Sequence, residues 1–249
     1  MTNLQYPREA SSFHILGVRV DDVTHEETLA LVEQFIARQS LHQICTVNPE
    51  FVMRAQQDTA FREVINHAAL CIPDGIGLLW AAKRLRHPLR ERVAGSDTVM
   101  RIAERAAQTG WRLYLLGAAP GVAEKAASVL QTRYPGLNVV GTFPGSPSPD
   151  EQGTIVERIR AARPDVLFVA FGAPAQDTWI ARNQPCLQVP VTMGVGGSLD
   201  FVAGVSRRAP RWMQRIGLEW LYRLIREPWR WRRQLALPCF VWQVLRAKR

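Results

Sequence analysis

The sequence predicts an α/β fold: a mostly parallel sheet flanked by helices, Rossmann-like, with a C-terminal basic amphipathic helical appendage. Two observations predict the sheet. The apolar runs are short and lack polar–apolar alternation, and segments with helix signals separate them. Strands of that kind are covered on both faces, as in parallel sheets. A third observation, the charge distribution, divides the chain into a body (residues 1–206) and an appendage (residues 207–249).

The first half of the body contains three expected strands, each followed by helix signals. Thr24 to Glu27 has the capping-box pattern, and Asn48 before Pro49 is typical of an N-cap followed by a first-turn proline. Ser96 is expected to cap the last helix of this half. The expected elements are a strand at 14–20, a helix at 24–38, a strand at 43–47, a helix at 48–67, a strand at 69–72, and helices at 77–85 and 97–109.

The second half of the body repeats this alternation more regularly. Strands are expected at 112–116, 137–142, 166–171 and 189–195, with helices that end near Arg133, Ala162 and Asn183. Glycine-rich or polar segments follow several strands. In open parallel sheets, ligands bind beyond the carboxyl ends of the strands. We therefore expect these segments to form a rim that accepts a phosphate or a nucleotide.

The appendage carries all of the excess positive charge. Residues 207–249 contain 12 Lys/Arg and 2 Asp/Glu, a net charge of +10, whereas the whole chain is +9 and the body −1. Five of the eight tryptophans lie there too, and the apolar residues of 211–226 fall on one side of a helical wheel. Arginine interleaved with indole suits an anionic membrane surface. The alternative is that the apolar face docks on the body and the basic face is solvated.

Other features of the sequence argue against a secreted, a membrane-spanning or a disulfide-bonded protein. The polar N-terminus predicts no secretory signal, and the lack of an apolar run of 18 residues predicts no spanning helix. The four cysteines lack metal-ligand or redox spacing, so we expect buried, reduced thiols in a cytosolic protein.

Three residues near the first strand ends are candidates for the site. Asp74 follows an apolar strand and precedes a glycine, so it is a candidate general base, although Pro-Asp-Gly is also an ordinary turn sequence. Thr46 and Asn48 lie at the end of the preceding strand. Asn48 is explained by N-capping alone, but a helix N-terminus at the rim is also a place for an anion or a sugar hydroxyl.

Four further candidates lie just after strands or before helices. Arg92 suits bidentate contact with a diphosphate, or a surface salt bridge to a neighbouring acid. Gly117 begins a glycine-rich turn that accepts one nucleotide, although the full dinucleotide fingerprint is missing. Gln176, with Asp177 directly after it, fits ligand binding or ordinary helix-start polarity equally well. Asp200 is a second buried-carboxylate candidate, with capping as its alternative.

The metal-dependent and nucleophilic motifs that we sought are missing. The sequence has no Asp-x-Asp pair, no His-Glu-x-x-His, no Walker loop and no Gly-x-Ser-x-Gly, and its five histidines are scattered. We therefore expect arginines and helix dipoles to neutralise phosphate charge without a metal or other cofactor.

Eight motifs in order carry a resemblance to a known family. They are TVNPE (46–50), PDGIG (73–77), RVAGSD (92–97), LLG (115–117), FGAPAQ (171–176), GVGGSLDF (194–201), RAPRW (208–212), and GLEWLYR (217–223) continuing through EPWR (227–230) to Arg233. Together they resemble the WecG/TagA/CpsF bacterial glycosyltransferases over about residues 13–245. The alanine at 175 departs from the charged or polar residue of many members.

The resemblance implies a peripheral membrane enzyme on the cytoplasmic face of the plasma membrane. Such enzymes transfer a hexose, of N-acetylmannosamine type in the reading we favour, from a UDP-sugar to a sugar on undecaprenyl diphosphate, with inversion, in cell-surface polysaccharide assembly. By motif position Asp74 matches the proposed base, and Thr46, Asn48, Arg92 and Gln176 match pocket residues. The tail arginines that are thought to complete the site match Arg223, Arg230 and Arg233.

Three rival interpretations remain at this point. A UDP-glucose-type transferase for exopolysaccharide or capsule would use the same site. A nucleic-acid-binding protein would use the basic tail to track phosphates, but no recognised motif supports it and no nucleic-acid partner is expected. A nucleotide-sugar sensor would bind the donor without turnover.

Overall fold

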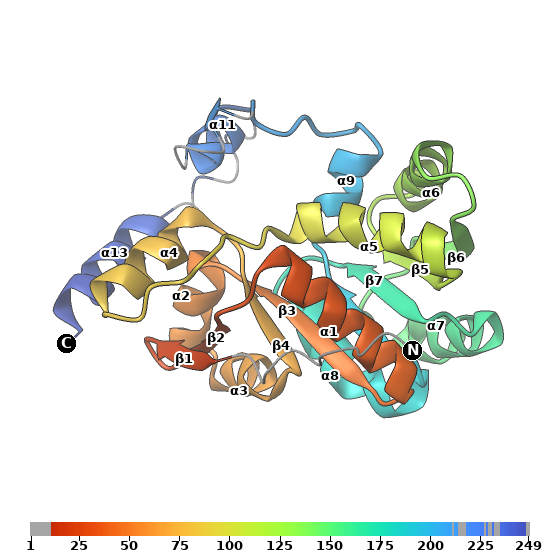
Figure 1. The fold of residues 1–249 in the computed structure, drawn as a ribbon, viewed down its shortest axis with the longest axis horizontal. Helices are drawn as coiled ribbons and strands as arrows, with labels where there is room; N and C mark the ends of the chain where they lie inside the picture. The colour runs from red at the N-terminus through yellow and green to blue at the C-terminus, as the bar shows by residue number, and fades with distance from the viewer. Residues whose placement is uncertain are drawn as a thin grey trace, which may run out of the picture.

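The computed structural model describes residues 11–210, 212–213, 218–226, 228, 231 and 235–247 (Figure 1). Six parallel strands form the central sheet in the order β4-β3-β8-β7-β5-β6. The predicted mostly parallel sheet is confirmed. Its strands are β3 (His42–Val47), β4 (Leu70–Pro73), β5 (Arg112–Gly117), β6 (Asn138–Phe143), β7 (Val166–Ala170) and β8 (Val191–Gly194).

The single strand predicted over residues 14–20 is wrong. Two antiparallel strands, β1 (Ser12–Ile15) and β2 (Val18–Asp21), form a hairpin instead. Leu16 and Gly17 make the turn, with φ of 50° and 80°. Two consecutive residues with positive φ match the twist of the strands that they join.

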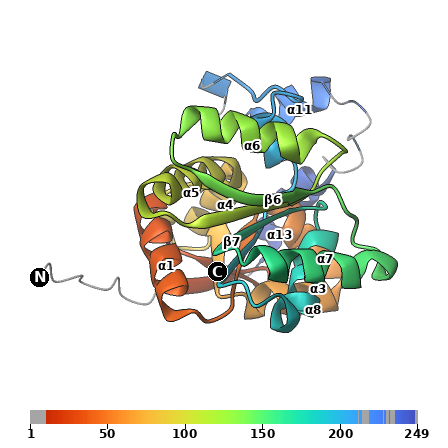
Figure 2. The same cartoon turned by 90° about the vertical axis from the view of Figure 1, so that its right-hand side faces the viewer.

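Helices cover both faces of the central sheet (Figure 2). On one face lie α1 (His25–Arg38), α5 (Gly95–Thr109), α6 (Val122–Arg133) and the short α9 (Ser198–Val202). The opposite face carries α2 (Pro49–Gln57), α3 (Thr59–His67), α4 (Ile76–Arg84), α7 (Pro149–Ala162) and α8 (Ala175–Leu187). Within β3, Ile44 packs toward α1 and α5 while Cys45 packs toward α2. Burial on both faces explains the continuous apolar runs.

Two expected helix boundaries are corrected. Residues 48–67 form two helices, because Asp58 ends α2 and caps α3 by accepting a hydrogen bond from the Phe61 N–H (2.9 Å). Ser96 is not a cap, since α5 begins at Gly95 and no side-chain cap is present. The capping box of α1 and the Asn48 cap of α2 are confirmed.

In the terminal segment (residues 207–249), the structure describes two helices of different character, α11 and α13. In α13 (Ala236–Arg246), which packs against α2 and α4, Phe240 and Val244 are fully buried in one cluster with Phe51. This last helix therefore belongs to the core of the body, although the sequence predicts 207–249 as an appendage. In α11 (Glu219–Arg226), which lies apart from the sheet in Figure 1, none of the described side chains is buried. No helix among the described residues is long and apolar enough to cross a membrane.

The cysteines only partly follow expectation. Cys45 and Cys71 are buried partners on β3 and β4, and burial raises the pKa of both thiols. Cys186 and Cys239 are exposed, contrary to the prediction. All four are free thiols.

Candidate active site

A cavity of about 470 Å³ opens at the carboxyl ends of β3, β4, β7 and β8. This is the edge at which the sequence predicts a ligand site. Six of the seven predicted residues of the body line it: Thr46, Asn48, Asp74, Arg92, Gln176 and Asp200. Before residue 207, five helices, α2, α4, α5, α8 and α9, begin at its wall. Their N-terminal dipoles favour a negatively charged ligand.

Asp74 follows β4 and keeps part of its surface open to the cavity. Its Oδ2 accepts a hydrogen bond from the Gly95 N–H (3.1 Å). Burial raises the pKa of the Asp74 carboxyl to about 6; the Gly95 N–H opposes this rise, the charge of Glu219 adds to it, and Arg92 and Arg208 oppose it. A carboxylate whose pKa lies near neutrality, at a cavity wall, is suited to accept a proton from a substrate hydroxyl.

Thr46 and Gly95 fix the position of Asp74. A Cβ at Gly95 would lie 2.9 Å from Thr46 Cγ2 and 3.3 Å from Asp74 Oδ2, so glycine is required for α5 to start this close. Thr46 is 7% exposed, and its hydroxyl donates to the Gly194 carbonyl (3.3 Å). Thr46 therefore joins the ends of β3 and β8 below the carboxylate.

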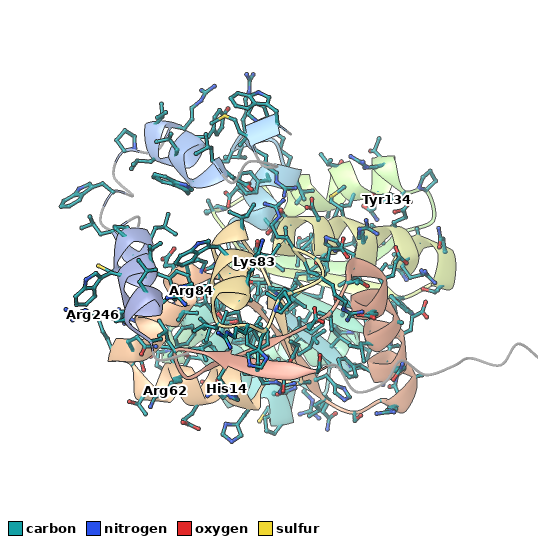
Figure 3. All side chains as sticks on the ribbon, turned by 60° about the vertical axis from the view of Figure 1, so that its left-hand side comes forward. His14, Arg62, Lys83, Arg84, Tyr134 and Arg246 are labelled. Atoms are coloured by element: carbon teal, nitrogen blue, oxygen red, sulfur yellow. The ribbon has the colours of Figure 1, made fainter. Side chains whose placement is uncertain are left out.

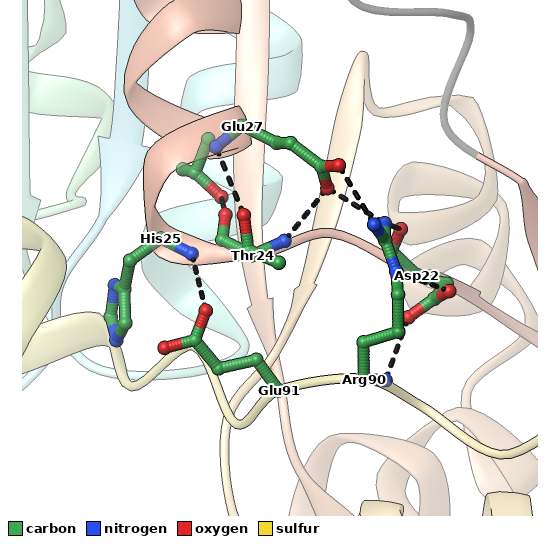
Figure 4. Close-up of polar contacts among 7 residues, drawn as sticks. Asp22, Thr24, His25, Glu27, Arg90 and Glu91 are labelled. Atoms are coloured by element: carbon green, nitrogen blue, oxygen red, sulfur yellow. Dashed lines mark hydrogen bonds and ion pairs between the residues drawn. The ribbon is translucent and has the colours of Figure 1, made fainter.

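The loop that carries Arg92 is anchored on the start of α1 (Figure 4). The guanidinium of Arg90 donates to the Asp22 carboxylate (2.8 Å) and to both oxygens of the Glu27 carboxylate (2.8 and 2.7 Å). The His25 N–H donates to Glu91 Oε2 (2.9 Å). These contacts clamp both residues that precede Arg92.

The side chain of Arg92 forms an ion pair with the terminal segment. Its Nη1 lies 3.6 Å from Glu219 Oε2, and its side chain is 22% exposed. The sequence offered a salt bridge to Glu91 or Asp97 as the alternative to ligand contact, and neither of those pairs is formed. The guanidinium lines the cavity, where a ligand phosphate would reach it.

Gln176 organises the rim and is only 2% exposed. Its Oε1 accepts hydrogen bonds from the Gly172 N–H (3.2 Å) and the Gly196 N–H (2.9 Å). One side chain thus joins the turns that follow β7 and β8. A Cβ at Gly194 would lie 2.6 Å from Gln176 Nε2, so the amide rests directly on the strand end.

The remaining predicted residues have different positions. Asn48 lines the cavity while its side chain accepts a hydrogen bond from the Phe51 N–H (3.0 Å), so capping and a place at the rim are compatible. Asp200 lines the cavity from the first turn of α9. Gly117 lies outside the cavity lining. A Cβ there would meet Phe171 at 2.8 Å, so its glycine is explained by packing, and substrate contact at Gly117 finds no support in the geometry.

The terminal segment forms one wall of the cavity. Glu219 and Trp220 of α11 and Ala236 and Leu237 of α13 line it. Arg230 and Arg233 lie outside the described residues, as does the side chain of Arg223. Their predicted contact with a lipid diphosphate stays a prediction.

Sequence reasoning missed two charged residues at the cavity. Arg208 and Glu219 line it and form an ion pair with each other (3.3 Å). Asp177 is fully buried under Gln176, and burial raises its pKa to about 7 against the opposing effects of Gln176 and Cys45. Arg208 and Glu219 lie within the motifs at 208–212 and 217–223, so the signal was present without an assigned role. Asp177, a candidate together with Gln176, lies outside the cavity lining.

Metal coordination is not evident in the described part of the chain. No group of three or more His, Cys, Asp or Glu side chains there is arranged to hold a metal ion. Metal-independent chemistry stays a prediction.

Comparisons with known proteins agree with this geometry. The model of the "Glycosyl transferase WecG/TagA/CpsF family" matches residues 13–249. Proteins of Staphylococcus aureus strains MW2, NCTC 8325 / PS 47 and COL are each 35% identical over 237 residues, covering 94% of this chain and 92% of their own. Each is named N-acetylglucosaminyldiphosphoundecaprenol N-acetyl-beta-D-mannosaminyltransferase. Because the family model and these relatives match nearly the whole length of the chain, it belongs to the WecG/TagA/CpsF family and is a glycosyltransferase.

Proposed function

We propose that the protein transfers an N-acetylmannosamine-type hexose from a UDP-sugar to a sugar carried on undecaprenyl diphosphate, with inversion. One observation carries the chemistry: Asp74, with a pKa raised to about 6, shares a cavity with two arginines and with the N-termini of α2, α4, α5, α8 and α9. The relatives' names, which specify a mannosaminyl group and a diphosphoundecaprenol acceptor, support the substrate classes.

In the proposed step the acceptor hydroxyl attacks the anomeric carbon of the donor. The new C–O bond forms as the bond to the UDP oxygen breaks, and the hydroxyl proton passes to the Asp74 carboxylate. Arg92 and the helix N-termini stabilise the negative charge that develops on the departing diphosphate. A single displacement of this kind inverts the anomeric centre and gives a β-linkage.

We also propose that the terminal segment holds the enzyme at the cytoplasmic face of the membrane. Nine of the thirteen exposed large hydrophobic residues of the described chain lie between Val205 and Leu245. The guanidinium of Arg246 stacks on the exposed Trp242 ring at 3.8 Å. Figure 3 shows Lys83, Arg84 and Arg246 on the side of the molecule formed by α4 and α13. Exposed indoles beside cations suit the headgroup region of an anionic leaflet.

A panel of UDP-sugars tested against undecaprenyl-diphosphate-linked acceptors, scored by product mass, tests the transfer. We expect a mass gain of one N-acetylhexosamine with UDP-N-acetylmannosamine. A hexose gain with UDP-glucose alone would favour the exopolysaccharide or capsule alternative. UDP binding with no acceptor-dependent UDP release would overturn the proposal in favour of a sensor.

Membrane attachment needs point variants, because removing residues 207–249 would also remove the core residues Phe240 and Val244. Trp242→Ala with Leu245→Ala should reduce flotation with anionic vesicles. Leu41→Ala with Val129→Ala, exposed on the body, is the matched control. Equal flotation of both pairs would contradict the α13 assignment. A salt-dependent gel shift with DNA, in the absence of flotation, would favour the nucleic-acid alternative.

A further inference from the structure

Four charged side chains form one cluster at the cavity wall, and three of them, Arg92, Arg208 and Glu219, line the cavity. Arg208 makes a two-pronged contact with Asp97: Nη1 donates to Oδ1, and Nη2 donates to Oδ2 at 3.1 Å. Its Nε lies 3.3 Å from Glu219 Oε1, while Arg92 Nη1 lies 3.6 Å from Glu219 Oε2. The two oxygens of the Glu219 carboxylate are therefore divided between two guanidinium groups.

The two carboxylates in this cluster are held differently. Asp97 lies in the first turn of α5, and Arg208 keeps the pKa of Asp97 below its ordinary value although burial alone would raise it. Glu219 belongs to α11 and makes the longer contacts. Asp97 orients the Arg208 fork from a fixed helix, whereas Glu219 reaches in from the terminal segment.

The position of Glu219 is that of a bridging anion. Arg92, Arg208 and Glu219 all line the cavity that contains Asp74. Two guanidinium groups that share one carboxylate present positive charge and N–H donors that a phosphate group can also satisfy, because both anions pair with arginine. The Glu219 carboxylate balances the positive charge of the two arginines while no substrate is bound.

We propose that Arg92 and Arg208 together bind a diphosphate group, and that Glu219 occupies this position in the free enzyme until the diphosphate displaces it. The inference rests on the proposed function, because both the donor and the lipid acceptor of that reaction carry a diphosphate. Arg208 is then a second phosphate-binding residue, and Glu219 is an internal competitor supplied by the segment that forms the cavity wall.

Equilibrium binding of UDP to the full-length protein tests this directly. Arg208→Ala should weaken UDP binding about tenfold or more, the scale of a lost charge-assisted hydrogen bond to an anion. Glu219→Gln should strengthen UDP binding several-fold, because it removes the competing anion. In an Arg208→Ala background, Glu219→Gln should give a clearly smaller gain, since one of the two guanidinium groups that it blocks is missing.

The ion pair between Arg105 and Glu33 (2.6 Å), outside the cavity, supplies matched controls. Arg105→Ala and Glu33→Gln should leave UDP affinity unchanged. Circular dichroism checks that each variant is folded, and Arg208→Lys, which keeps the charge but not the fork, replaces Arg208→Ala if that variant is unfolded. Weaker UDP binding in Glu219→Gln, or native affinity in the Arg208 variants for every diphosphate tested, would overturn the proposal.

Farnesyl diphosphate separates the two sources of the diphosphate. If Arg208→Ala and Glu219→Gln change UDP affinity, the donor uses the pair; if they change only farnesyl diphosphate affinity, the carrier lipid uses it. A native protein that binds no UDP at all would refute the proposed donor. A native protein that binds UDP while both variants bind UDP and farnesyl diphosphate with native affinity would refute only this inference.

Discussion

The pH dependence of turnover gives a quantitative test of Asp74 as the general base. With a pKa of about 6, the carboxyl is about one-tenth ionised at pH 5 and about nine-tenths ionised at pH 7. Because only the ionised form accepts a proton, kcat/KM should rise about tenfold between those pH values and then level off. An ordinary aspartate, with its pKa near 4, would leave kcat/KM almost constant over the same range.

Glu219 supplies an internal check on this assignment. Its negative charge contributes to the raised pKa of Asp74. Glu219→Gln should therefore move the midpoint of the pH profile to lower pH, while Glu33→Gln, which lies outside the cavity, should not move it. The sign follows from electrostatics: a nearby negative charge disfavours the ionised carboxylate, and its removal favours it.

The assay is acceptor-dependent UDP release at constant ionic strength, with circular dichroism to confirm that the enzyme stays folded from pH 5 to 8. Asp74→Asn should lower kcat by about 10²-fold or more and remove the rise with pH, while UDP still binds. A near-normal rate in Asp74→Asn, or an unchanged pH midpoint near 6 in that variant, would refute the role of Asp74.

Four further predictions concern phosphate binding, metal dependence, core packing and the buried Asp177. Arg92→Lys should not restore the UDP affinity lost in Arg92→Ala, because an ammonium lacks the guanidinium fork; titration calorimetry with UDP compares them. EDTA should leave product formation largely intact, and a loss reversed by magnesium or manganese would contradict metal-free catalysis. Phe240→Ala, which empties a core position of α13, should lower the free energy of unfolding in urea by about 3–5 kcal/mol, whereas exposed Val241→Ala should change it by less than about 0.5 kcal/mol. Burial raises the pKa of Asp177 to about 7, so the folded protein holds this proton more tightly than the unfolded chain does. The free energy of unfolding should therefore fall as pH rises from about 4 to 7, by roughly 4 kcal/mol at most from this group. Asp177→Asn should flatten that slope.

The body of the fold could be predicted from sequence because its strands are buried on both faces. That burial produces the continuous apolar runs of β5 and β7, whose expected ends lie within a residue of the observed ones. The hairpin of β1 and β2 was missed because its turn, Leu16-Gly17, lacks the usual Asn-Gly or Asp-Gly signal. The break between α2 and α3 was missed although Asp58 is a good N-cap residue, because apolar residues continue at helical spacing on both sides.

The candidate site likewise has a part that the sequence predicts and a part that it does not. Thr46 lies near the end of β3, and Asp74 and Gln176 come after β4 and β7. Parallel strands bring their carboxyl ends to one edge, so local sequence was enough to group these residues. That rule does not say which part of the edge is used. Gly117 ends β5, which β7 and β8 separate from β3, and it lies outside the cavity lining. Arg208 and Glu219 follow the last strand, where no sheet rule fixes their position.

The cavity therefore has two parts with different origins. Its floor is built by strand ends and by Thr46 and Gln176, whose hydrogen bonds join neighbouring strands and turns. One wall comes from α11 and α13, and α11 also supplies the carboxylate that the two guanidinium groups share. A ligand that fills the cavity must contact both parts. Substitutions in α11 should consequently change donor affinity even where they leave the unfolding free energy unchanged. Measuring UDP affinity and unfolding free energy in Glu219→Gln, with Glu33→Gln as the control, tests this.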